Sequence, residues 1–309
     1  MYKYNTLILD FLQYKRNLGY KYRSEEIILK EIAKYLSNNN VTIITKEITE
    51  KYARNNENIS QNTLARNMGV FREFNKYLLL NDIECYQIPL KLYPQNHHNF
   101  IPYVFSYDEI KRIYSNLNFI YNSPNYTYYQ KTIYPLIIKL LYQTGMRIGE
   151  VISIAINNYS ENYFILYNTK NGQDRKVMIP LTLKEEIKKY HTKFHYQSDN
   201  DELFFKVKVT PVEKYFKKLL RLSNIKITNN GPRLHDLRHT FIVHTIEKFR
   251  KDGKDMDEML PILQAYVGHQ SLASLTYYFH LNNDILQELK NISNKTFNNL
   301  IPVRGDENE

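Results

Sequence analysis

The sequence predicts a mainly α-helical protein with one small β-hairpin, an α+β arrangement in its second half, and a division into two domains. Three observations support this prediction. Apolar residues in positions 1–88 recur at helical spacing, a glycine-containing turn separates two strand-like runs near residue 171, and a proline-interrupted stretch lies between the halves. The 309 residues also exceed the roughly 100 to 200 usual for one domain.

Four helices are expected in residues 1–88, which form the first predicted domain. Their apolar positions lie three or four residues apart, as on the buried face of a helix. The four sets are Leu7, Ile8, Phe11 and Leu12; Ile27, Ile28, Ile32 and Leu36; Ile44, Ile48 and Tyr52; and Leu64, Met68, Phe71, Phe74 and Leu78.

A group of basic residues interleaved with tyrosines lies between the first two of these sets. Such a patch is typical of a surface that contacts DNA phosphates, and a solvated face with no partner is an equally good interpretation. The candidate DNA-binding residues are Lys15, Arg16, Lys21 and Arg23.

The domain boundary is expected within IPLKLYPQNHHNFIPYV, residues 88–104, which contains three prolines. Proline lacks the backbone N–H and fixes φ, so the stretch favours an extended linker between two helix-rich regions. The expected division is a helical domain at 1–88, a linker at 89–103, a second domain at 104–281, and a C-terminal helix and tail at 282–309.

The second domain opens with Ser106 to Glu109, a capping box whose side chains satisfy the amides at a helix start. A second box is expected from Thr210 to Glu213, with Pro211 at the first helical position. Between them, YFILYNT and RKVMIPL flank Asn171 and Gly172, which tolerate the positive φ angles of a tight hairpin turn. Further helices are expected at 134–144, 147–155, 211–222, 235–249, 256–266, 271–280 and 283–299.

Composition narrows the class of protein. A chain with 43% hydrophobic and 24% charged residues is ordinary for a globular protein, and no apolar run reaches the roughly 18 residues of a membrane span. Asp10 interrupts the stretch that a signal peptide would need, and Cys85 is the single cysteine, so secretion, disulfides and cysteine-based zinc sites are not expected. The net charge of +10 favours an anionic partner such as nucleic acid.

Neither GxGxxG nor GxxxxGK occurs, so nucleotide-driven chemistry is not expected. Two other segments hold arginines in constrained positions. In LLYQTGMRIGEV, 140–151, a helix is expected to end at Gly145 and another to begin with Arg147 just inside the turn; an ion pair between Arg147 and Glu150 is an equally good interpretation. In RLHDLRHTFIVH, His235 and Arg238 share one helix face.

Alternative interpretations exist for each of these polar residues. His235 and His239 have the i, i+4 spacing of metal ligands, although the acidic base and third ligand of an HExxH-type site are missing. In YVGHQSLASLTYYFHL, 266–281, Tyr277 and Tyr278 follow the pair Gly268 and His269, and tyrosine pairs usually pack in cores. Lys170 lies beside the hairpin turn, where most lysines are merely solvated.

Together these four segments resemble, in order and spacing, the catalytic domain of the tyrosine recombinases, the family of lambda integrase and the XerC and XerD recombinases. TGMRIGE is similar to the first arginine box, HDLRH to the His-x-x-Arg box, and GHQSLASLTYYFH to the closing His-to-Tyr box. The match covers 106–281, with an apparent insertion around KFRKDGKDMDEM. Residues 1–88 resemble the family's helical, SAM-like core-binding domain only in size, position and helix content.

The resemblance implies a site-specific DNA recombinase, an integrase or transposase of a mobile element, that forms a 3′-phosphotyrosine intermediate with no metal, ATP or other cofactor. The arginines would stabilise charge on the phosphate, and His235 would donate to it or accept the tyrosine proton. Lys170 would protonate the leaving oxygen, with Lys176 as its nearest competitor, and Glu150 would orient Arg147. The implied catalytic residues are Arg147, Lys170, His235, Arg238, His269 and Tyr278.

The implied partner is double-stranded DNA, clamped by both domains, with a homotetramer on synapsed DNA and no membrane. The apolar helical pattern of 282–300 is expected to pack on a neighbouring subunit, or alternatively on its own domain. An accessory DNA-bending or directionality factor would be a further partner, and the expected location is cytoplasmic, on the nucleoid when DNA is bound. Alternatives are a type IB topoisomerase, a catalytically decayed DNA-binding protein and a metal-dependent phosphoesterase.

Overall fold

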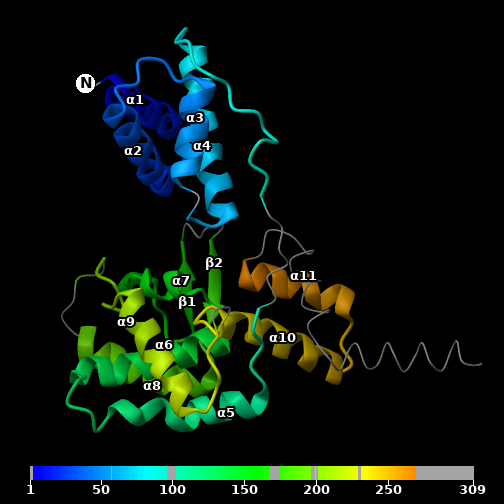
Figure 1. The fold of residues 1–309 in the computed structure, drawn as a ribbon. Coiled ribbons are helices and arrows are strands. Elements are labelled where there is room, and N and C mark those ends of the chain that lie inside the picture. The colour runs from blue at the N-terminus through cyan, green and yellow to red at the C-terminus, as the bar shows by residue number, and fades with distance from the viewer. Residues whose placement is uncertain are drawn as a thin grey trace, which may run out of the picture. The chain divides into compact units, whose positions relative to one another are not determined.

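The computed structural model describes residues 3–56, 58–95, 102–167, 174–195, 199, 201–228 and 231–268. The chain divides into two compact units, Met1–Phe100 and Ile101–Glu309. Its described part is mostly helical with one two-stranded antiparallel sheet, as the sequence predicted (Figure 1). None of the helices within these residues is long and apolar enough to cross a membrane.

The described residues of the first unit form a bundle of four helices, at the positions expected from the apolar spacing (Figure 1). Thr45 and Ser60 accept hydrogen bonds from the backbone of the third and fourth helices and fix where these begin. Phe11, Phe71 and Phe74 are fully buried in the core. The helices are α1 (Lys3–Asn17), α2 (Arg23–Asn38), α3 (Lys46–Asn55) and α4 (Gln61–Leu80).

The second unit is built around α6 (Tyr128–Thr144), which packs against α8, α9 and α10 and has a largely apolar, buried surface. The other elements are α5 (Tyr107–Asn116), η1 (Leu117–Ile120), α7 (Ile148–Ile152), η2 (Ile156–Asn158), β1 (Tyr163–Leu166), β2 (Arg175–Met178), α8 (Leu181–His195), α9 (Val209–Leu222), α10 (Asp236–Lys251) and α11 (Met256–Val267). Because α10 contacts both α6 and α11, the ends of these three helices can form one site.

The predicted hairpin is present as the antiparallel pair β1 and β2. Its register pairs Tyr163 with Met178 and Leu166 with Arg175. The expected turn at Asn171 and Gly172 lies outside the described residues. β2 also contacts α11, the helix that precedes the motif at 268–280. The hairpin therefore packs beside the start of that motif.

Several helix boundaries differ from those expected. α6 begins at Tyr128 instead of residue 134, because Thr127 and Gln130 form an unrecognised capping box, and Pro135 lies inside the helix. The box expected at Thr210 is wrong: α9 begins at Val209, two residues before the expected first helical residue, Pro211. Pro211 therefore lies in the first turn, where its missing N–H would have no helical partner anyway.

Two further differences concern whole elements. The single helix expected at 147–155 is instead the short α7 followed by the turn η2. α8 was not among the expected helices, although Leu183, Ile187 and Tyr190 form its buried face at helical spacing. The expected helices at 271–280 and 283–299 lie outside the described residues.

Gly145 terminates α6 with a φ of +65°, and a Cβ added there would lie 2.3 Å from Cδ1 of Phe241. We expect Gly145→Ala to lower the free energy of unfolding of the second unit by about 3 kcal/mol, because it combines backbone strain with a clash. Gly149→Ala is the matched control, since its Cβ meets no atom within 4 Å in α7. Urea titration should show Gly149→Ala unchanged or stabilised by about 0.5–1 kcal/mol; equal effects of the two variants would contradict this account.

Candidate active site

Arg147 is held at the junction between α6 and α7. It is the N-terminal capping residue of α7, and its backbone amide donates to Oε2 of Glu150 at 2.8 Å. Its guanidinium donates from Nη1 to Oε1 of Glu150 at 2.8 Å and from Nη2 to the Gly268 carbonyl oxygen at 3.5 Å. The ion pair with Glu150 is therefore present, and the Arg147 side chain remains 23% exposed.

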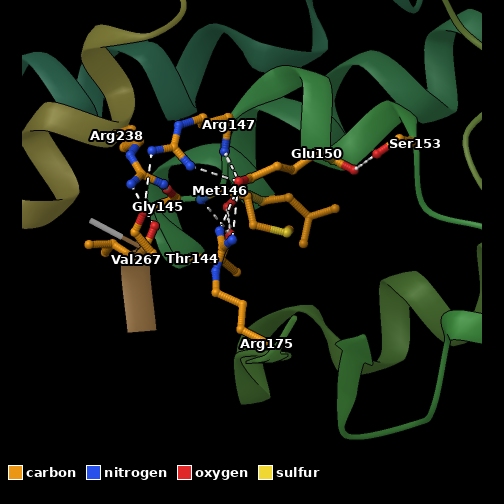
Figure 2. Close-up of polar contacts among 11 residues, drawn as sticks. Thr144, Gly145, Met146, Arg147, Glu150, Ser153, Arg175, Arg238 and Val267 are labelled. Atoms are coloured by element: carbon orange, nitrogen blue, oxygen red, sulfur yellow. Dashed lines mark hydrogen bonds and ion pairs between the residues drawn. The ribbon is translucent and has the colours of Figure 1, made fainter. Parts of the chain in front are cut away.

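Arg238, on the first turns of α10, is only 2% exposed. Its Nη1 donates to the Gly145 carbonyl oxygen at 2.7 Å and its Nη2 to the Val267 carbonyl oxygen at 2.6 Å. The two predicted phosphate-binding arginines thus meet at one place, between the end of α6 and the end of α11 (Figure 2).

Glu150 lies beneath these arginines and is almost fully buried. It accepts hydrogen bonds from Arg147 and from both terminal nitrogens of Arg175, at 3.1 and 2.8 Å (Figure 2). Burial by itself would raise the pKa of this carboxyl, but the hydrogen bonds and positive charges of the two arginines outweigh it and lower the pKa. Glu150 is therefore ionised near neutral pH and forms an ion pair with Arg147.

His235 stands at the N-terminal end of α10, three residues before Arg238. Its ring lies edge-on to that of His239, with centroids 4.8 Å apart. Although part of the side chain is exposed, desolvation by the surrounding protein, followed by the charges of His239, Arg238 and Arg147, lowers the His235 pKa to about 4. Its imidazole is therefore neutral near pH 7, with a lone pair on one ring nitrogen.

Three of the predicted catalytic residues, Lys170, His269 and Tyr278, lie outside the described residues, as does Tyr277. The described structure brings together the other three, Arg147, His235 and Arg238.

Comparison with known proteins identifies the family of this chain. The family model for the phage integrase family matches residues 104–284, more than half of the chain. The chain belongs to the phage integrase family. This confirms the resemblance to the tyrosine recombinases.

Relatives and a solved structure agree with this assignment. The tyrosine recombinase XerC of Staphylococcus epidermidis is 23% identical over 301 residues, 94% of this chain and 96% of that protein. The tyrosine recombinase XerA of Pyrococcus furiosus is 31% identical over 164 residues, 50% of this chain and 52% of that protein. A lambda integrase dimer bound to a core site shares the fold, with a TM-score of 0.60 and 14% identity over 88% of this chain and 93% of that chain.

Sequence reasoning missed Arg175, a third arginine at this site, which contacts Glu150. It begins β2, its side chain is 8% exposed, and it lies on the same face of the strand as the buried Val177. Alternation along RKVMIPL places residues 175, 177 and 179 on one face, so this period could have indicated an inward-pointing arginine.

The basic residues proposed to contact DNA in the first unit differ in their exposure and in their partners. Lys15 is 3.2 Å from Glu73, its side chain is 15% exposed, and its Nζ lies over three aromatic rings at 5.5 to 5.7 Å. Arg16 pairs with a glutamate of α2 at 2.5 Å. Lys21 and Arg23 are exposed. The Lys15 charge is thus compensated inside the bundle, while a DNA contact from the exposed pair stays a prediction.

The histidines of α10 do not form a described metal centre. No group of three or more His, Cys, Asp or Glu side chains in the described part of the chain has an arrangement that would hold a metal ion. His244 is a hydrogen-bonded helix histidine: its Nδ1 lies 2.9 Å from the Tyr142 hydroxyl, and its ring stacks on Tyr107.

Proposed function

We propose that this recombinase is the integrase or transposase of a mobile element, and that it breaks and rejoins DNA through Tyr278. The observation that carries the proposal is the convergence of Arg147 and Arg238 on the ends of α6 and α11. Two permanently charged guanidiniums held by backbone carbonyls suit a phosphodiester in a fixed position. The Tn1549 transposon integrase and lambda integrase, which are structural neighbours of this chain, support the mobile-element role.

The proposed reaction is a transesterification. The Tyr278 hydroxyl oxygen forms a bond to phosphorus while the bond from phosphorus to the DNA 5′ oxygen breaks, which leaves a 3′-phosphotyrosine ester. The phenolic proton passes to His235, and the Lys170 ammonium gives a proton to the departing oxygen. The reverse step, attack by the 5′ hydroxyl of another strand, rejoins DNA and restores the tyrosine.

The arginines act on the charge that builds up during this step. Negative charge accumulates on the non-bridging oxygens in the pentavalent transition state, and preorganised cations stabilise it more than they stabilise the ground state. Arg147 is more exposed than Arg238 and offers its guanidinium more openly to the phosphate. His269 is assigned to a hydrogen bond with the phosphate.

The proposed reaction requires no divalent metal or ATP, so we expect the protein to cleave and join duplex DNA in buffer containing EDTA. The measurement is formation of joined product on labelled duplexes with and without chelator, and a Tyr278→Phe protein controls for contaminating nuclease. Loss of activity in EDTA that zinc or magnesium restores would replace this mechanism with one based on histidine-bound metal.

The proposed partner is duplex DNA in the cytoplasm, gripped by both units of the chain, with residues 1–88 as the DNA-binding domain and 89–103 as the linker. Four protomers would assemble on synapsed DNA, with residues 282–300 of each reaching a neighbour. An accessory DNA-bending or directionality factor would act on this assembly.

Truncation after residue 281 is expected to leave DNA binding intact but to impair synapsis, because the tail would supply the contact between protomers. Gel shifts should show single-site binding within a few-fold of the full chain and loss of the slower synaptic complex. Removal of 301–309 alone is the matched control, since it spares the apolar helical pattern. Normal recombination by the longer truncation would refute an exchanged tail.

A further inference from the structure

Arg175 joins three parts of the fold at the site. It lies at the start of β2, and both of its terminal nitrogens contact Glu150, a residue of α7, in a bidentate ion pair. Its guanidinium also lies against the end of α11, because a Cβ added to Gly268 would be 3.1 Å from Nη1 and 3.4 Å from Cζ. A side chain at Gly268 would crowd this guanidinium, so the glycine leaves room for the close approach.

The carboxylate that Arg175 binds is shared with Arg147. Oε1 of Glu150 accepts from Arg147 Nη1 at 2.8 Å and from Arg175 Nη1 at 3.1 Å, while Oε2 accepts from the Arg147 amide and from Arg175 Nη2. One buried negative charge therefore stands between two positive charges, and all three side chains are at most 23% exposed.

The charge of this trio depends on Arg175. Without Arg175, Arg147 and Glu150 would form a neutral ion pair. The positive charge of Arg147 would then be fully compensated by the Glu150 carboxylate. With Arg175 present the trio carries a net positive charge. Interactions in a buried site are weakly screened, so this difference matters for an anionic ligand beside Arg147.

We infer that Arg175 is a positioning residue: it compensates the charge of Glu150, so that the permanent positive charge of Arg147 stays available to the scissile phosphate. The inference rests on the proposed function, because it assigns a phosphate to Arg147. Glu150 then orients Arg147 without making the local charge of the site zero. β2 contributes Arg175 to the site, in addition to being one strand of the hairpin whose loop contains Lys170.

The test compares two DNA substrates in single-turnover cleavage. One carries the natural scissile phosphate, and the other carries a methylphosphonate at the same place, which lacks the negative charge on a non-bridging oxygen. Arg175→Gln should slow cleavage of the natural substrate roughly 10- to 100-fold, the usual size of the effect when a supporting partner is removed. The loss should be several-fold smaller on the methylphosphonate.

Three further variants separate charge from structure. Glu150→Gln combined with Arg175→Gln should recover most of the rate lost by Arg175→Gln on the natural substrate, because no carboxylate remains to neutralise Arg147. Arg175→Lys should retain more activity than Arg175→Gln. Lys188→Gln is the matched control, since it removes one positive charge from an exposed pair with Glu161 and should cleave at the wild-type rate.

The inference is overturned if Arg175→Gln cleaves the natural substrate at the wild-type rate, or if its defect is equal on both substrates and is not relieved by Glu150→Gln. An equal, unrelieved defect would mean that Arg175 acts only in folding. Failure of the proposed function looks different, because the wild-type chain would then form no covalent adduct on either substrate.

Discussion

Tyr278→Phe should abolish the covalent protein–DNA adduct while leaving DNA affinity unchanged, because the variant lacks only the attacking oxygen. Neighbouring residues of a helix point about 100° apart, so Tyr277 and Tyr278 cannot both face the phosphate. By its resemblance to the family's closing box, the sequence places the nucleophile nine residues after His269 and two before His280, which selects Tyr278.

The measurement is adduct formation on a nicked trapping substrate, resolved on a denaturing gel. Tyr277→Phe is the matched control and should still form the adduct. A tyrosine hydroxyl titrates near pH 10, so the arginines and His235 must favour its deprotonation during attack. Mass spectrometry that locates the nucleotide on Tyr277 would overturn the assignment.

Arg147→Gln should lower the rate of single-turnover cleavage by about 10²- to 10³-fold, equivalent to roughly 3–4 kcal/mol of transition-state stabilisation. DNA affinity should fall much less, since most binding energy comes from many phosphate contacts. Arg147 suits this test better than Arg238 because its side chain is 23% exposed, whereas the almost fully buried Arg238 also connects two helix ends.

Arg112→Gln is the control for the loss of one guanidinium, because Arg112 is exposed on α5 and donates to the backbone oxygen of Asn224. It should cleave normally. If Arg147→Gln instead weakens DNA binding by the same factor as the rate, Arg147 contributes to ground-state binding and not to the transition state.

Local signals in the sequence were sufficient for much of the fold. The capping box at Ser106 forms as predicted, with the Ser106 hydroxyl and the Glu109 carboxylate each accepting a backbone N–H. The helix end at Gly145 also occurs where expected. Each of these features depends on atoms within about one turn of chain, so the residue types suffice to predict it.

Helix starts were predicted less accurately. α6 was expected from residue 134 but begins at Tyr128, because the capping box of Thr127 and Gln130 was not recognised. α9 also begins before the expected residue 211, at Val209, and Lys208 is its capping residue in place of Thr210.

The sequence by itself determined the family and the candidate residues, because their identities and order along the chain carry that information. The tertiary structure alone decided that Arg238 reaches the carbonyl oxygen of Gly145, 93 positions away, and that Arg175 shares Glu150 with Arg147 across 25 positions. It also enclosed Lys15 beside Glu73. The physical reason is that such contacts depend on helix packing and strand register, which set side-chain charges a few ångströms apart and leave no periodic trace in the sequence.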